Sequence, residues 1–62
     1  MINLKNYIGQ NVIIKTKNNL IFKGFVSDYF PSDENENGEE SIALENPAIE
    51  FNKDEIKEIS II

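Results

Sequence analysis

The chain has 62 residues and a net charge of −5, with six lysines against eleven acidic residues and no histidine, cysteine, arginine or tryptophan. A chain of this length forms at most one domain with a small core, and it lacks the residues for a disulfide, a zinc site, a thiol nucleophile or an imidazole base. We therefore expect neither an enzyme nor a bound cofactor, and the acidic balance disfavours general binding to nucleic acid.

The N-terminal residues have no positively charged segment followed by a long apolar run, and no apolar run approaches the roughly 18 residues of a membrane span. We expect a cytoplasmic protein without a signal peptide or a membrane partner. We also expect a single domain over residues 1–62. The one marked shift in composition is an acidic segment at about 31–40, which is predicted to be a hydrated loop.

The first predicted element is a short helical turn. Asn3 is a typical N-cap residue, and Leu4, Tyr7 and Ile8 would lie on one side of the turn. Gly9 suits the left-handed conformation that follows a helix end. The turn is expected to cover one end of an apolar core.

A first strand is predicted next, because apolar and polar residues alternate there. Val12, Ile14 and Thr16 would face one way and the residues between them the other way. Asn18 and Asn19 follow this run. Since Asn tolerates positive φ angles, they predict a two-residue hairpin turn.

The second predicted strand, residues 20–30, is the longest and is apolar on both faces. Gly24 lies in its middle, and a glycine inside a long strand marks a bend or a bulge. A bent strand can serve two sheets and bring apolar side chains from both faces to one core. We therefore expect a sheet that closes into a small barrel.

Residues 41–44 predict a third strand, 45–47 a turn, and 48–51 a fourth strand with Ile49 and Phe51 facing inward. The next four residues are too polar for a strand and suit one 3₁₀ turn, and the remainder predicts a last strand.

The expected fold is therefore all-β: a five-stranded SH3-like or Sm-like small barrel. A short N-terminal helical turn precedes its first strand, and a 3₁₀ turn over residues 52–55 precedes its last strand, residues 56–62.

Five segments carry a resemblance to a known family. They are Gly-Gln-Asn-Val-Ile-Ile at 9–14, Asn-Asn at 18–19, Phe-Lys-Gly-Phe-Val at 22–26, Ile-Ala-Leu at 42–44 and Phe-Asn-Lys-Asp-Glu-Ile at 51–56. Over nearly its whole length the chain resembles the Sm-like family, and in particular the short acidic Sm-like proteins of Firmicutes. The resemblance implies that the fourth and fifth strands of neighbouring subunits pair edge to edge into rings.

In RNA-binding members of that family, the nucleotide pocket falls at positions that correspond here to Glu40, Ser41, Asn52 and Lys53. A base stacks on an aromatic or guanidinium face, and Glu40 offers neither. Because the chain departs from the family pattern there, binding of RNA or of single-stranded nucleic acid is the alternative prediction and not the main one.

A basic patch is predicted on the outward face of the first hairpin. It comprises Lys15, Lys17 and Lys23, with Ile21 and Phe25 between them. Basic residues interleaved with aromatic ones are typical of single-strand binders. The alternative is that these lysines keep the face hydrated and the strand edges unpaired.

Tyr29 and Phe30 end the long strand beside the acidic segment. They would either line a peptide groove or plug the mouth of the barrel.

The acidic segment contains the opening of an EF-hand calcium loop, with candidate ligands Asp33, Asn35 and Asn37. The twelfth position, which should be a bidentate Glu, is Leu44, and no helices flank the segment. We expect no metal, and a weak calcium site is the alternative to a hydrated loop.

The last strand is apolar on both faces, more than a barrel interior needs. We therefore predict a non-enzymatic interaction module that forms a homo-oligomer and contacts a protein partner. The predicted oligomer edge consists of Ile49 and Phe51 on the fourth strand and Ile59 and Ile61 on the last. The alternative is a monomer whose last strand frays at its end.

Overall fold

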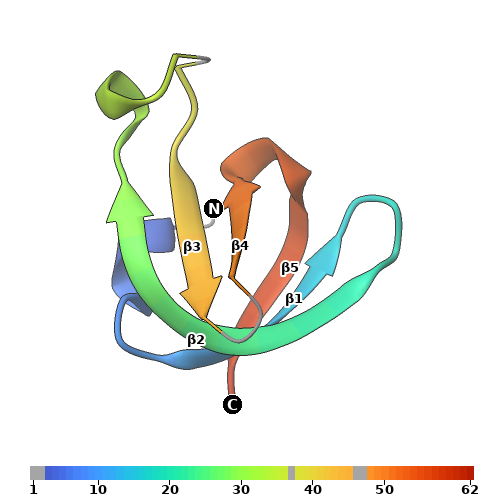
Figure 1. The fold of residues 1–62 in the computed structure, drawn as a ribbon. Coiled ribbons are helices and arrows are strands. Elements are labelled where there is room, and N and C mark those ends of the chain that lie inside the picture. Colours follow the sequence, from blue (N-terminus) through green and yellow to red (C-terminus); the bar gives the residue numbers. More distant parts are fainter. Residues whose placement is uncertain (1–2, 37, 46–47) are drawn as a thin grey trace.

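The computed structural model describes residues 3–36, 38–45 and 48–62, and within them the chain forms one five-stranded antiparallel sheet (Figure 1). The strands are β1 (Asn11–Thr16), β2 (Ile21–Phe30), β3 (Ser41–Glu45), β4 (Ile49–Asn52) and β5 (Ile56–Ile61). Three short 3₁₀ helices accompany them: η1 (Leu4–Tyr7), η2 (Ser32–Glu34) and η3 (Lys53–Glu55). The all-β class, the N-terminal turn and the 3₁₀ turn before the last strand are confirmed.

The strand order is β4-β3-β2-β1-β5, so β4 and β5 are the edge strands of the sheet in the described part of the chain. The sheet is strongly curved, and the long strand β2 follows this curvature from its first residue to its last (Figure 1). The turn predicted at 45–47 falls largely on Asn46 and Pro47, which lie outside the described residues. No helix in the described ranges is long and apolar enough to cross a membrane.

Strand β2 divides its pairing between two neighbours. Residues 21–25 pair with β1, and residues 25–30 pair with β3. The register against β3 shifts across Ser27, which marks a bulge, and a bulge bends a strand and increases its twist. The predicted irregularity therefore lies at Ser27 and not at Gly24.

Gly24 marks a close approach to β3 instead. A Cβ atom built on Gly24 would lie 3.1 Å from the backbone oxygen of Glu45 and 3.2 Å from Cδ1 of Leu44. The first of these neighbours is backbone, so it cannot move aside by a simple rotamer change. The glycine lets the two strands lie together where β2 passes from β1 to β3.

Gly24→Ala is expected to lower the free energy of unfolding by about 1–2 kcal/mol, because the neighbouring strand must shift to admit the methyl group. At an unstrained site the same change would stabilise the protein by about 0.4–1 kcal/mol through the unfolded chain. Urea unfolding therefore distinguishes the two cases by the sign of the change in the free energy of unfolding. Ser60→Ala, at an exposed position, is the neutral control. A stabilised Gly24→Ala variant would contradict the close approach.

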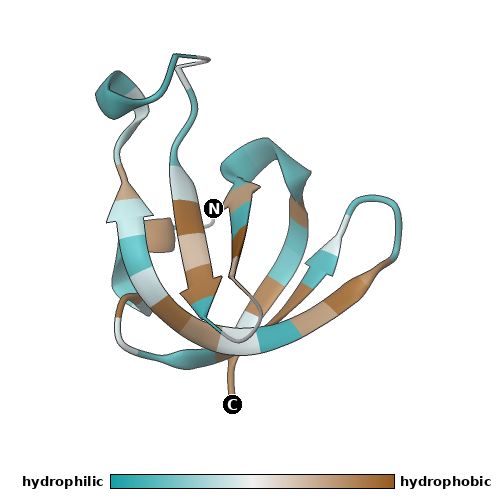
Figure 2. Ribbon diagram, viewed as in Figure 1, coloured by the Kyte–Doolittle hydropathy of each residue, from teal (hydrophilic) through white to brown (hydrophobic). Residues whose placement is uncertain are grey.

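The core lies between the curved sheet and η1, and all five strands contribute to it. Its buried apolar side chains among the described residues are Leu4, Val12, Ile14, Val26, Ile42, Leu44, Phe51 and Ile56. Tyr7, Phe22, Tyr29, Ile49 and Ile59 are partly buried and pack around them. Hydrophobic segments recur on every strand, whereas η2 and η3 are hydrophilic (Figure 2).

The N-terminal turn differs from the prediction in two details. Asn3 occupies the N-cap position but its side chain makes no capping hydrogen bond, and Ile8 is exposed. A 3₁₀ helix has three residues per turn, so Leu4 and Tyr7 share the core-facing side and Ile8 is turned away. The left-handed conformation of Gly9 is confirmed by its φ of 79°.

The hairpin between β1 and β2 is longer than predicted. Of the described non-glycine residues only Asn19 has a positive φ, 67°. The Thr16 N–H donates to the Leu20 carbonyl at 2.9 Å, and the Asn19 N–H donates to the Thr16 carbonyl at 2.9 Å. Residues 17–19 therefore form a three-residue loop whose last residue is left-handed, a common hairpin geometry. Lys17 consequently lies in the loop and not on the outward face of a strand.

Candidate functional site

The four predicted edge residues all lie on β4 or β5, but they differ in exposure. Phe51 is only 4% exposed and packs against the ring of Phe22, with centroids 5.1 Å apart. Ile49 and Ile59 are half-buried against the core, whereas Ile61 is 55% exposed. Phe51 therefore belongs to the core, as its predicted inward orientation requires, and of the four predicted edge residues Ile61 alone is exposed.

Ile61 is exposed although its register places it on the core face of the sheet. It pairs directly with Val12, which is fully buried, and Ile59 pairs with buried Ile14. Side chains directly opposite each other on paired strands lie on the same face. Because β5 is the outermost strand on this side, the apolar face continues to the edge without a described strand to cover it.

Some backbone N–H groups of β5 point to the side opposite its neighbour β1. The Ile62 N–H donates to the Asn11 carbonyl at 2.9 Å, so it points toward β1. Along an antiparallel strand the backbone groups of successive residues point to alternate sides. The N–H groups of Ile61 and Ile59 therefore point outward, where a strand of another chain can pair with them.

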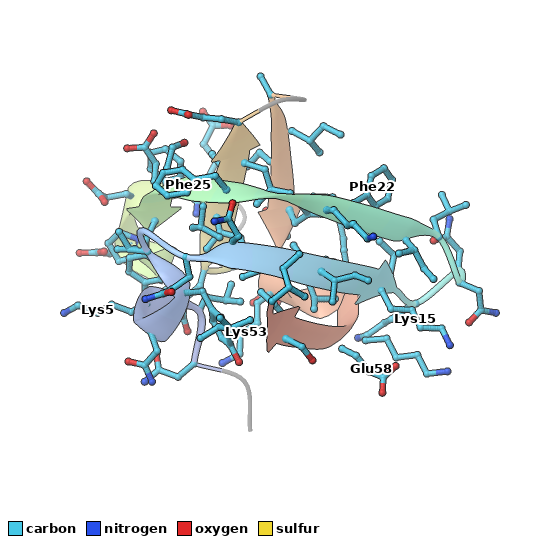
Figure 3. All side chains as sticks on the ribbon, turned by 90° about the horizontal axis from the view of Figure 1, so that it is seen from below. Lys5, Lys15, Phe22, Phe25, Lys53 and Glu58 are labelled. Carbon is cyan, nitrogen blue, oxygen red and sulfur yellow. The ribbon has the colours of Figure 1, made fainter. Side chains whose placement is uncertain are left out.

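The outer face of β1, β2 and β5 holds Lys15, Lys23 and Phe25. Lys15 pairs with Ile21 on one side and with Glu58 on the other, so a carboxylate lies in the predicted basic patch (Figure 3). A shallow hollow of about 190 Å³ on this face is lined by Ile13, Lys15, Ile21, Glu58 and Ser60. With Lys17 in the hairpin loop, the patch is smaller than predicted.

The positions that correspond to the family's nucleotide pocket do come together, beside the ends of β2, β3 and β4. The Lys53 ammonium lies 3.4 Å from Glu40 Oε2, and the Lys53 N–H donates to the Glu40 carbonyl at 2.8 Å. The Tyr29 hydroxyl donates to Glu40 Oε1 at 2.7 Å. The Glu40 carboxylate therefore accepts a hydrogen bond from the Tyr29 hydroxyl and pairs with the Lys53 ammonium of this cluster.

These contacts shift the pKa values of Glu40 and Tyr29. The hydrogen bond from Tyr29 is the main reason that the pKa of the Glu40 carboxyl is lowered; burial opposes it, and the positive charge and hydrogen bond of Lys53 lower the pKa further. The same hydrogen bond is the main reason that the pKa of Tyr29 is raised above its ordinary value. Both shifts favour the pair of neutral tyrosine and ionised glutamate that the structure contains.

Tyr29→Phe is expected to lower the stability near neutral pH and to flatten its dependence on pH. The contribution of Glu40 is present above the pKa of the unfolded carboxyl, about 4, and is lost as the pH falls through the lower folded value. The contribution of Tyr29 is present below about pH 10 and is lost as the pH rises through the raised folded value. The difference in the free energy of unfolding between Tyr29→Phe and wild type should thus become smaller at both ends of the pH range.

Urea unfolding from acid to alkaline pH measures this effect. Tyr7→Phe is the matched control, because Tyr7 is also half-buried but its hydroxyl bonds no group in the described part of the chain. A constant difference between Tyr29→Phe and wild type across the whole range would show that the hydroxyl is not coupled to Glu40.

Tyr29 and Phe30 are both half-buried at the end of β2. Tyr29 packs against the core and turns its hydroxyl to Glu40, whereas Phe30 pairs with Ser41 at the start of β3. Their placement in the described part of the chain, against the core and beside β3, favours the structural alternative over a peptide groove.

The acidic segment is largely exposed, as predicted, but it has local structure of its own. It contains η2, which was not predicted, and the side-chain amide of Asn35 donates to the Glu39 carbonyl at 2.6 Å and to Ser41 Oγ at 3.2 Å. Asn35 thus holds the loop against β3, and Asn37 lies outside the described residues. Within the described ranges no group of three or more acidic side chains is placed to hold a metal ion.

A groove between the β1–β2 hairpin and η3 was not predicted. It encloses about 420 Å³, with Leu20, Phe22 and Phe51 as its apolar part, Thr16, Lys17 and Asn18 on the hairpin side and Asp54 and Glu55 on the η3 side. These residues are far apart in the chain, and only the curvature of the sheet brings them together. No pattern in the sequence pointed to this groove.

Comparison of the chain with protein-family models, with curated proteins and with solved structures finds no match. The Sm-like resemblance therefore rests on the chain's own residues. What is established is an all-β protein with one five-stranded antiparallel sheet and two edge strands in its described part.

Proposed function

We propose that this chain is a non-enzymatic small-barrel module, of the SH3-like or Sm-like type, that associates with copies of itself and contacts other proteins. The observation that carries the proposal is the edge of β5. There Ile61 is exposed on the core face of the sheet, beside N–H groups that point outward. An apolar strand edge of this kind is a template for pairing with another chain.

The size of the core supports the same proposal. A chain of this length buries only about 60% of its unfolded surface, and small domains often gain stability from oligomerisation. A second copy seated against β5 would cover Ile61 and complete the burial of Ile59. Association thus adds apolar burial where the isolated chain leaves it incomplete.

The two edges differ, which favours a head-to-tail arrangement. β4 has four residues and carries exposed Glu50, whereas β5 has six residues and carries exposed Lys57 and Glu58. Because the two edges differ in length and in side chains, a contact between β4 of one copy and β5 of the next joins unlike edges. Repeated with a closing rotation, a contact between unlike edges generates a ring.

The mass in solution tests this function. Sedimentation of the protein at about 100 μM should give a multiple of the 7.1 kDa chain mass, decreasing on dilution. A mass of one chain at every concentration would overturn the proposal.

Nucleic-acid binding is the second candidate, and the outer face favours it because Lys15 and Lys23 lie there with Phe25. Against it stand the net charge of −5 and the pairing of Lys53 with Glu40. Binding of oligo-U that weakens steeply with salt would support it. Absence of oligo-U binding at low salt would exclude nucleic-acid binding as a function.

A further inference from the structure

We propose that the groove between the β1–β2 hairpin and η3 binds an extended segment of a partner protein that carries a basic residue next to aliphatic ones. The inference rests on the protein-binding part of the proposed function and names the partner's chemistry. It does not depend on self-association, because the groove is formed within one chain and neither Ile59 nor Ile61 is among its lining residues.

The apolar part of the groove supplies the contact area. Leu20 is 52% exposed, and Phe22 is half-buried with its ring packed on Phe51 beneath it. Phe22 lies toward the hairpin end of β2 (Figure 3). A side chain with an aliphatic stem can pack on this surface while its polar end stays in water, as lysine and arginine side chains do.

The charges of the η3 side select a cation. Asp54 makes no hydrogen bond or ion pair within the described part of the chain, and the Glu55 carboxylate accepts only the Asn52 N–H, at 3.1 Å. Lys17 on the hairpin side is the single opposing charge. With two carboxylates against one ammonium, and a chain of net charge −5, the groove attracts basic segments and repels acidic ones.

The two sides of the groove are held together before any partner binds. The Lys17 N–H donates to the Glu55 carbonyl at 3.0 Å and so ties the hairpin to η3. Within the hairpin the Leu20 N–H donates to Thr16 Oγ1 at 3.1 Å, and the Thr16 hydroxyl donates to Asn18 Oδ1. A site that is already formed costs less to order on binding.

A nuclear magnetic resonance titration with a short synthetic peptide tests the site. The peptide has a Leu-Arg-Leu core between Gly-Ser repeats, and two matched peptides have Leu-Glu-Leu and Ser-Arg-Ser cores. The first should shift the backbone amides of residues 16–22 and 53–55, and each of the other two should bind at least about fivefold more weakly.

Charge substitutions on the two sides of the groove should act in opposite directions. Asp54→Lys should weaken binding of the Leu-Arg-Leu peptide about fivefold or more, and Lys17→Glu should strengthen it by a similar factor at low salt. The matched controls are Glu34→Lys on η2 and Lys23→Glu on the outer face, which change the net charge equally at exposed sites remote from the groove. Both controls should bind within about twofold of wild type.

Three outcomes would overturn the inference. The first is no shift at millimolar peptide, and the second is shifts confined to the outer face of β1, β2 and β5. The third is shifts of groove amides with protein concentration alone, which would make a second copy the occupant. Sedimentation of the same samples separates the two proposals, because loss of peptide binding with an unchanged oligomer mass refutes only this one.

Discussion

Ile42→Ala is expected to leave most of the protein unfolded at 25 °C. Ile42 is fully buried on β3, between Tyr29 on one neighbouring strand and Phe51 on the other. Removing its branched side chain costs about 2–5 kcal/mol, because the cavity that remains is only partly refilled. A domain of this size has only about 3–5 kcal/mol of stability to lose.

Circular dichroism with urea unfolding measures this effect, and Ile21→Ala is the matched control. Ile21 is 61% exposed on β2, so the same chemical change should alter the free energy of unfolding by no more than about 0.5 kcal/mol. If the two variants lost similar stability, Ile42 would not be at the centre of the core.

Ile61→Lys is expected to convert the assembled protein to single chains without unfolding it. The substitution places a charge on the exposed, outermost strand at the point where the apolar face is uncovered. A lysine at a strand edge opposes pairing with another chain, since its ammonium would have to leave water. Sedimentation at about 100 μM should give a mass near 7.1 kDa.

Ile21→Lys separates this effect from a general loss of surface hydrophobicity. Ile21 has a similar exposure, but β2 lies in the middle of the sheet and not at its edge. The Ile21→Lys protein should therefore keep the mass of the wild type. If it dissociated while Ile61→Lys remained assembled, the interface would lie on the outer face and not at the edge of β5.

The strands could be predicted where burial alternates with a clear period. Val12, Ile14 and Thr16 face the core as their spacing requires, and the run after residue 41 buries Ile42 and Leu44 in the same way. The 3₁₀ turn before the last strand was also predictable, because residues 52–55 are too polar for a strand. In the structure the Glu55 carboxylate accepts a hydrogen bond from the Asn52 N–H within this turn. These features are local, so the sequence contains their physical causes.

The features that depend on contacts across the sheet could not be predicted in the same way. Gly24 suggested a bend or a bulge, but the bulge is at Ser27, where the register of β2 against β3 shifts. Phe51 was assigned to an edge by its strand, yet its ring packs against Phe22 in the core. The spacing of residues indicates which face of a strand a side chain lies on, but it does not indicate where that strand lies in the sheet.

The candidate sites show the same limit. The resemblance singled out Glu40 and Lys53, but only the fold shows that the Glu40 carboxylate pairs with the Lys53 ammonium and accepts a hydrogen bond from the Tyr29 hydroxyl. The groove combines the β1–β2 hairpin, the start of β2, β4 and η3, and its two sides lie far apart in the chain, as Lys17 and Glu55 do. No pattern within a single segment predicts such a surface.

Amide hydrogen exchange at Ile59 and Ile61, followed from dilute to concentrated protein, tests most directly whether copies join at the edge of β5. Ile62 serves as the internal reference, since its N–H already bonds Asn11 within one chain. The proposed assembly predicts that Ile59 and Ile61 gain protection with concentration while Ile62 changes little. Rapid exchange of Ile59 and Ile61 at every concentration would contradict it.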